Sequence, residues 1–194
     1  PVLRPVIPFC CPSLLCRCAI FTAALLVLRA FPLLVSIRRC EHLPMRSIGL
    51  GTAHWWKSIL WGLVIAIVSA VAVGLLAYLT GYGHGPWSAA FDKLPLWLIT
   101  AIVLRAGAVE ELFYRGYAIE RLRLVGLGRF WSVAIPLVIF SFGHWTGGAA
   151  NILIAFAAGL ILTGSYLSRR NLLANMIGHG LIALLANVVP NLLP

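Results

Sequence analysis

The sequence predicts an all-α fold: a polytopic membrane helix bundle of about six transmembrane helices. Of the 194 residues, 61% are hydrophobic and only 10% are charged, whereas about a quarter of a soluble domain is charged. The mean hydropathy is +0.98. Several apolar segments approach the roughly 20 residues that a helix needs to span a bilayer. These observations favour a membrane protein over the alternative, a soluble helical bundle with a large core.

The six apolar segments cover roughly residues 14–37, 58–80, 94–119, 130–146, 148–167 and 171–189. All are expected to be helical, because a helix satisfies its own backbone hydrogen bonds in lipid and no alternating barrel pattern occurs. The stretches GYGHGP and GHWTGG are turn-rich breaks between segments. The first segment is the least regular, because it contains Arg29 and Pro32.

The first 44 residues differ from the rest of the chain. They contain all five cysteines, and the first methionine of the sequence is Met45. The cysteine spacing matches neither a common zinc site nor a clear disulfide framework. We therefore expect residues 1–44 to be a poorly constrained N-terminal extension with one possible transmembrane helix, or part of a longer protein. Residues 45–194 are expected to form the main domain.

The net charge of +10 is concentrated in the links between apolar segments. Nine Lys and Arg residues lie in the links 38–57, 120–129 and 168–171, whereas the links expected on the opposite side hold only Lys93. Because positive residues favour the cytoplasmic side, the links 120–129 and 168–171 are predicted to be cytoplasmic. The sequence lacks the interleaved aromatic and basic residues that would suggest nucleic-acid binding, and no nucleic-acid partner is expected.

The third segment carries ionisable residues, which are costly in a membrane and usually functional. On a helix, Glu111 and Arg115 are i,i+4 neighbours and are expected to pair. Glu110 points about 100° away from Glu111 and lacks that partner. We therefore predict Glu110 as the general base and the Glu111–Arg115 pair as a brace. The alternative is that these side chains only hold helices together.

Two histidines on later segments are expected at a similar depth. Counted from the nearest predicted cytoplasmic arginine, Glu111, His144 and His179 lie roughly 15, 22 and 14 Å into the membrane. Phe140 shares the helix face of His144, and Asn175 that of His179. The carboxylates, histidines and amide are therefore expected to meet around a water molecule.

These residues give the chain a resemblance to the CAAX protease and bacteriocin-processing family of intramembrane endopeptidases. That family has the pattern EExxxR, then FxxxH, then HxxxN or HxxxD. Glu110, Glu111 and Arg115 match the first motif, Phe140 and His144 match the second, and His179 matches the third, over about residues 45–194. The family's Asn or Asp is replaced by Ala183. Asn175, one turn before His179, is predicted to substitute for it more readily than Asn187, two turns after.

The resemblance implies hydrolysis of a peptide bond inside the membrane. Glu110 with His144 would activate a water, and His179 with Asn175 would stabilise the oxyanion, as acyl transfer requires. Phe140 is expected to contact substrate. No cofactor is expected, since the H-E-x-x-H zinc motif is absent; a zinc-dependent form would use Glu110, His144 and His179.

Two other functions stay open. Ser165 and His179 are a weaker pair for a serine protease. Ala183 keeps open a non-catalytic membrane protein, such as a bacteriocin immunity protein. The expected partners are membrane lipid and a peptide or protein substrate, such as a prenylated protein or a bacteriocin precursor. We expect the protein in a bacterial cell membrane.

Overall fold

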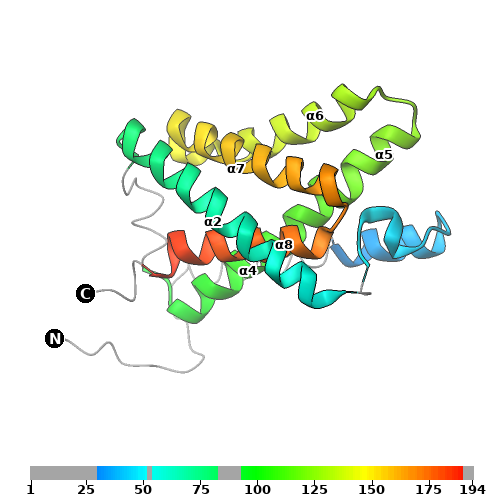
Figure 1. The fold of residues 1–194 in the computed structure, drawn as a ribbon, viewed down its shortest axis with the longest axis horizontal. Helices are drawn as coiled ribbons and strands as arrows, with labels where there is room; N and C mark the ends of the chain where they lie inside the picture. Colours follow the sequence, from blue (N-terminus) through cyan, green and yellow to red (C-terminus); the bar gives the residue numbers. More distant parts are fainter. Residues whose placement is uncertain (1–29, 52–53, 83–92, 190–194) are drawn as a thin grey trace.

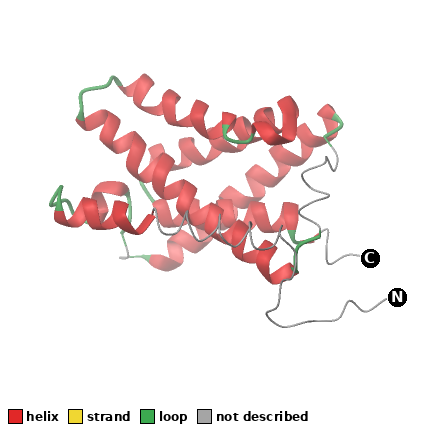
Figure 2. Cartoon of the chain, turned by 180° about the vertical axis from the view of Figure 1, so that it is seen from behind, coloured by secondary structure: helices red, strands yellow, loops and turns green. Residues whose placement is uncertain are grey.

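The computed structural model describes residues 30–51, 54–82 and 93–189, and within these ranges it contains helices and no strand (Figures 1 and 2). The predicted all-α bundle is confirmed. The elements labelled in Figure 1 and the short turns between them are η1 (Met45–Ile48), α2 (Trp55–Thr80), α4 (Leu96–Glu111), η2 (Leu112–Ala118), α5 (Ile119–Leu124), α6 (Arg129–Phe142), η3 (Trp145–Gly147), α7 (Gly148–Arg169) and α8 (Leu172–Asn187). Residues 30–39 are also helical.

The helices correspond closely to the predicted apolar segments. Segments 58–80, 130–146, 148–167 and 171–189 match α2, α6, α7 and α8. The third segment becomes three consecutive helical elements, α4, η2 and α5. Residues 14–29 of the first segment and 83–92 of the link that follows α2 lie outside the described residues.

Two helices of the described ranges are long and apolar enough to cross a membrane, Trp55–Thr80 and Trp145–Arg169. Arg129–Phe142 and Leu172–Asn187 are shorter apolar helices. The prediction of about six spans therefore exceeds the number that meets this length criterion. The reason is local, because α6 stops at Gly143, before the GHWTGG turn, and α8 is only 16 residues long.

Helix α2 exposes an apolar surface on the outside of the bundle. Its exposed side chains include Ile67 at 64%, Val71 at 66% and Leu79 at 67%. Contiguous apolar surface of this kind is unusual on a soluble monomer and is what lipid contact requires. The surface agrees with the composition, which has too few polar residues to cover the outside of the bundle.

Helix α8 packs against both α2 and α4 and lies near the centre of the bundle (Figure 1). It begins at Asn171, whose side-chain oxygen accepts a hydrogen bond from the Ala174 backbone N–H at 3.0 Å, a common helix cap. At its crossing with α4, a Cβ on Gly107 would lie 2.7 Å from the backbone nitrogen of Gly180. This close approach brings the polar residues of the two helices together.

The described part of the N-terminal region packs onto this bundle. Ile37 is fully buried in a cluster with Leu112 of η2, Ile119 of α5 and Tyr166 of α7. Glu41 also forms an ion pair with Arg121 of α5 at 2.6 Å. From residue 30 onward, the predicted extension is therefore attached to the helices that carry the candidate site.

Candidate active site

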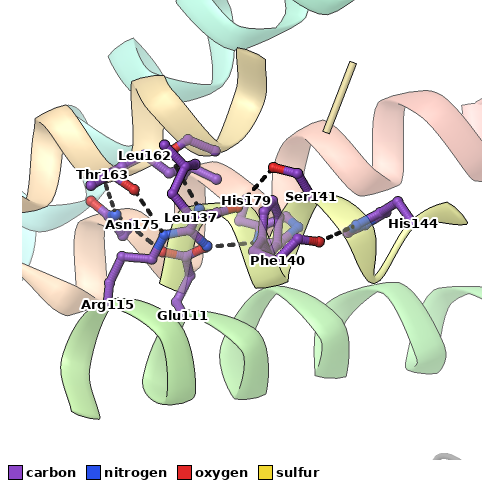
Figure 3. A network of polar contacts seen from close by, with 11 residues as sticks. Glu111, Arg115, Leu137, Phe140, Ser141, His144, Leu162, Thr163, Asn175 and His179 are labelled. Atoms are coloured by element: carbon purple, nitrogen blue, oxygen red, sulfur yellow. Dashed lines mark hydrogen bonds and ion pairs between the residues drawn. The ribbon is translucent and has the colours of Figure 1, made fainter. Parts of the chain in front are cut away.

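A closed polar network surrounds the carboxylate of Glu111 (Figure 3). Arg115 Nη1 lies 2.7 Å and His179 Nδ1 lies 2.9 Å from Glu111 Oε1. Asn175 Nδ2 donates to Glu111 Oε2 at 3.1 Å. Glu111 and Asn175 are fully buried. The predicted Glu111–Arg115 pair is confirmed, and the network satisfies both oxygens of Glu111.

The Arg115 guanidinium is held from several directions. It donates to Thr163 Oγ1 at 3.4 Å and to the Gly159 carbonyl oxygen at 3.3 Å, both on α7. Its Cζ lies 4.2 Å from the centroid of the Phe140 ring. A Cβ on Gly159 would come within 3.3 Å of the guanidinium, so glycine leaves the space that Arg115 fills. Such a satisfied buried pair holds its members in one geometry.

The helix changes from α to π directly after Glu111, over the seven residues of η2. Single π-helical turns inside α-helices often occur at functional sites. Arg115 lies within this turn and Glu111 at its N-terminal boundary. Residue spacing does not reveal this turn, although the Glu111–Arg115 pair predicted for a regular α-helix still forms.

Glu110 lies in a different environment from Glu111. It lines a cavity of about 450 Å³ together with Arg105, Tyr114 and His144. Its Oε2 atom is buried and has no hydrogen-bond partner among the described residues. Since buried carboxylate oxygens are normally hydrogen-bonded, this atom is available for a ligand or water. The rest of the cavity wall is mainly apolar and aromatic, with Val109, Phe113, Tyr117, Ala118, Phe140 and Gly143.

His144 lies just after α6, at the start of the η3 turn. Its Nδ1 is 2.9 Å from the carbonyl oxygen of Phe140. A carbonyl oxygen only accepts hydrogen bonds, so Nδ1 carries the hydrogen and Nε2 of the neutral ring keeps its lone pair. The His144 carbonyl oxygen also accepts a hydrogen bond from Asn151 at 2.9 Å. These contacts fix a histidine with one basic nitrogen at the cavity that contains Glu110.

Phe140 lies between the closed network and His144 (Figure 3), and it also lines the cavity. Its ring centroid is 4.9 Å from that of His144, 5.9 Å from that of His179 and 5.3 Å from that of Tyr114. The residue is only 3% exposed. Phe140 therefore positions both histidines, and it also forms part of the cavity wall; contact with substrate stays a prediction.

Of the two amide residues, Asn175 belongs to the Glu111 network and Asn187 does not. Asn175 uses its two amide hydrogens on Glu111 Oε2 and on the Leu162 carbonyl oxygen, at 3.1 and 2.7 Å. It is therefore linked to His179 through Glu111, and its amide hydrogens are not directed at an oxyanion. Asn187 donates to the Ala183 carbonyl oxygen on its own helix. Ala183 packs against the apolar cluster that contains Leu98, outside the polar network.

The zinc-dependent and serine-protease alternatives can be compared with this geometry. Among the described residues, no group of three or more His, Cys, Asp or Glu side chains is arranged to bind one metal ion. The zinc-dependent alternative with Glu110, His144 and His179 stays a prediction. The Ser165 hydroxyl accepts a hydrogen bond from Trp61 Nε1 at 2.9 Å, outside the Glu111 network.

Several residues of the site had no motif to reveal them. Gly159, Thr163 and the Leu162 carbonyl come from α7, which the sequence patterns left without a polar role. Asn151, at the start of the same helix, supports His144. Only the packing of α7 against α6 and η2 shows these contributions, because backbone acceptors leave no sequence signature.

A family comparison agrees with this arrangement. Residues 92–185 match the family described as Rce1-like, type II CAAX prenyl endopeptidase Rce1-like. The matched segment includes Glu110, Arg115, His144 and His179. The resemblance seen in the motifs is confirmed: this match, over just under half of the chain, supports membership of the family of CAAX proteases and bacteriocin-processing enzymes. None of the curated proteins or solved structures compared with the chain gave a match.

Family membership and the two long apolar helices identify the chain as an integral membrane protein. At family level it is a CAAX-type intramembrane protease, with a peptide or protein as substrate.

Proposed function

We propose that the chain hydrolyses a peptide bond of a membrane-associated protein or peptide with a water activated by Glu110 and His144. One observation carries this proposal. Glu110 Oε2 is buried at a cavity wall without a partner among the described residues, whereas both oxygens of Glu111 are hydrogen-bonded. A general base needs a carboxylate that can still accept a proton.

In this mechanism, water binds between Glu110 and His144. Glu110 takes one proton as the water oxygen forms its bond to the substrate carbonyl carbon. His144 Nε2 accepts the second water hydrogen as a hydrogen bond and orients the attack. Collapse of the tetrahedral intermediate breaks the C–N bond, and Glu110 returns its proton to the leaving amine. The reaction consumes one water and needs no redox partner.

His179 is assigned to the oxyanion. Its Nδ1 contacts the Glu111 carboxylate at 2.9 Å and therefore carries a hydrogen. When the ring is protonated, Nε2–H can donate to the developing oxyanion, while Glu111 balances the positive charge. His179 is 13% exposed, whereas Glu111 and Arg115 are almost completely buried. It is thus the most accessible side chain of the three. Arg115 and Asn175 act as positioning residues through Glu111.

We propose that no metal takes part, since Glu110, His144 and His179 do not form a set of ligands for one ion. The zinc-dependent form remains the alternative that a chelator test addresses. Ala183 favours one second candidate, a non-catalytic role such as that of an immunity protein. The family's amide at this position is replaced by a methyl group beside an apolar cluster, so the oxyanion site lacks one donor.

The cavity supports a substrate with apolar residues near the cleaved bond. Its wall combines Glu110 and His144 with the rings of Phe113, Tyr114 and Tyr117. A prenylated protein or a bacteriocin precursor has this chemistry, since each presents an apolar or lipidated segment at the membrane. We propose that the substrate belongs to one of these two classes.

For the orientation, we propose that links 120–129 and 168–171 face the cytoplasm of a bacterial cell. The distribution of Lys and Arg supports it. In a variant whose five cysteines are replaced by serine, Ser168→Cys should be shielded from a membrane-impermeant thiol reagent added outside intact cells. Labelling from outside would reverse this topology.

The proposed function is tested with the full chain in proteoliposomes and a quenched fluorescent peptide, offered with and without a farnesyl group. Wild-type protein should cleave at least one form, and Glu110→Gln should not. Glu120→Gln is the matched control, because Glu120 is buried on the same continuous helix and does not line the cavity. Cleavage that persists in Glu110→Gln would contradict the proposal, and no cleavage by any form would support the non-catalytic candidate.

A further inference from the structure

A second cavity lies where α2 begins and α7 ends, away from the candidate active site. It has a volume of about 300 Å³. Its wall includes His54, Lys57, Ser58 and Trp61 of the α2 region, and Arg169 and Arg170 at the end of α7. None of these residues takes part in the proposed hydrolysis.

The wall of this cavity carries excess positive charge. It contains Lys57, Arg169 and Arg170 and no acidic residue. Arg170 pairs with Glu120 at 2.8 Å, which neutralises one of the three cations. Within the part of the chain that the structure describes, Lys57 and Arg169 form no ion pair. Two cations are therefore left for an anionic ligand.

The cations are held by aromatic rings. Trp61 Nε1 donates to Ser165 Oγ at 2.9 Å, which fixes the indole between α2 and α7. Arg169 Cζ lies 4.1 Å from the centroid of that ring, within cation–π distance. Lys57 Nζ lies 5.3 Å from the Trp56 ring. Arg169 in particular is thus oriented before any ligand binds, which lowers the entropy cost of binding.

The cavity also lies where the two long apolar helices have adjoining ends. It is located at the start of Trp55–Thr80 and the end of Trp145–Arg169, the two described helices long enough to cross a bilayer. Trp55 and Trp56 are 63% and 49% exposed there, and tryptophan is enriched at membrane–water interfaces. Further along α2 the exposed side chains are apolar, beginning with Ile59, Leu60, Leu63 and Val64.

We propose that this cavity binds the phosphate of an anionic phospholipid, between Lys57 and Arg169, with the acyl chains along the exposed face of α2. Basic pockets between transmembrane helices are known to bind phospholipid head groups. A free phosphate compound shares the anionic group but would not use the adjacent apolar face. The lipid is therefore the ligand that accounts for both the basic cavity and the apolar face of α2.

The test measures the melting temperature of the purified full chain in a neutral detergent. Short-chain phosphatidylglycerol should raise Tm by about 2–4 °C, because a ligand that binds only the folded state stabilises it. Short-chain phosphatidylcholine and glycerol 3-phosphate should leave Tm within error. The double variant Lys57→Gln/Arg169→Gln should lose the shift while keeping the wild-type Tm without lipid, because both residues are exposed.

The matched control is Arg39→Gln/Arg129→Gln, which removes two exposed positive charges elsewhere and should keep the shift. If the Lys57/Arg169 variant does not fold, Arg169→Gln alone provides the same comparison and should at least halve the shift. An equal shift with phosphatidylcholine would mean that only apolar contact is measured. An equal shift with glycerol 3-phosphate would make a free phosphate the ligand. Either result, or a full shift in the Lys57/Arg169 variant, overturns the proposal.

Discussion

Two neighbouring carboxylates, Glu110 and Glu111, occupy contrasting parts of the molecule. Glu111 lies in a closed network in which Arg115, His179 and Asn175 contact its oxygens at 2.7–3.1 Å. Glu110 lines an open cavity of about 450 Å³, with one buried oxygen that has no partner among the described residues. The network holds the Glu111 carboxylate in place, whereas the cavity leaves the Glu110 carboxylate able to react.

The contrast suggests how adjacent acids can serve different purposes. A satisfied buried network is rigid and loses stability when one member is removed. An unsatisfied buried oxygen costs stability but can accept a proton or a water. Phe140 lies between the Glu111 network and His144, and it also lines the cavity.

The largest expected effect on stability is that of Arg115→Met. This change leaves the Glu111 charge buried without its strongest partner, and breaking a buried pair typically costs about 3–5 kcal/mol. Arg121→Met is the control, because its ion pair with Glu41 is partly exposed, at 15% and 24% of the two side chains, and should contribute less than the fully buried pair. Denaturant unfolding in detergent compares the two variants. Equal losses would show that the Glu111 network is no stronger than a surface ion pair.

A smaller effect, on turnover, is expected for Asn175→Ala. Glu111 loses one hydrogen bond, and His179 loses part of the support that aims its N–H. We predict that kcat falls by about 10²-fold, the cost of a small misplacement of a catalytic group, with KM little changed. Asn187→Ala should change kcat little, because Asn187 donates to Ala183 on its own helix. A larger effect at Asn187 would place the support for His179 elsewhere.

The smallest expected effect is that of chelators. Incubation with EDTA or 1,10-phenanthroline should leave the cleavage rate unchanged, because the described residues lack a group of three metal-binding side chains arranged around one ion. The peptide assay with and without chelator measures this. Loss of activity that returns on addition of zinc would replace the glutamate mechanism by the metal alternative.

Much of this arrangement could be predicted from the sequence. The i,i+4 spacing indicated the Glu111–Arg115 pair, and the positions of His144 and His179 along their helices indicated a shared depth. The π-turn at Leu112–Ala118 could not be read from spacing, because tertiary packing decides it. The roles of Asn175 and Gly159 were also hidden, since they depend on contacts between α7, α8 and η2 that no local pattern encodes.

The central claim is that Glu110 reacts while Glu111 braces, and one paired measurement tests it. Turnover and melting temperature are measured for Glu110→Gln and Glu111→Gln in the same detergent. We predict that Glu110→Gln lowers turnover by at least about 10²-fold, as expected for loss of a general base, with Tm unchanged or higher. Glu111→Gln should lower Tm as well as turnover. Wild-type turnover in Glu110→Gln, or a Glu111→Gln variant that melts normally yet is inactive, would contradict the account.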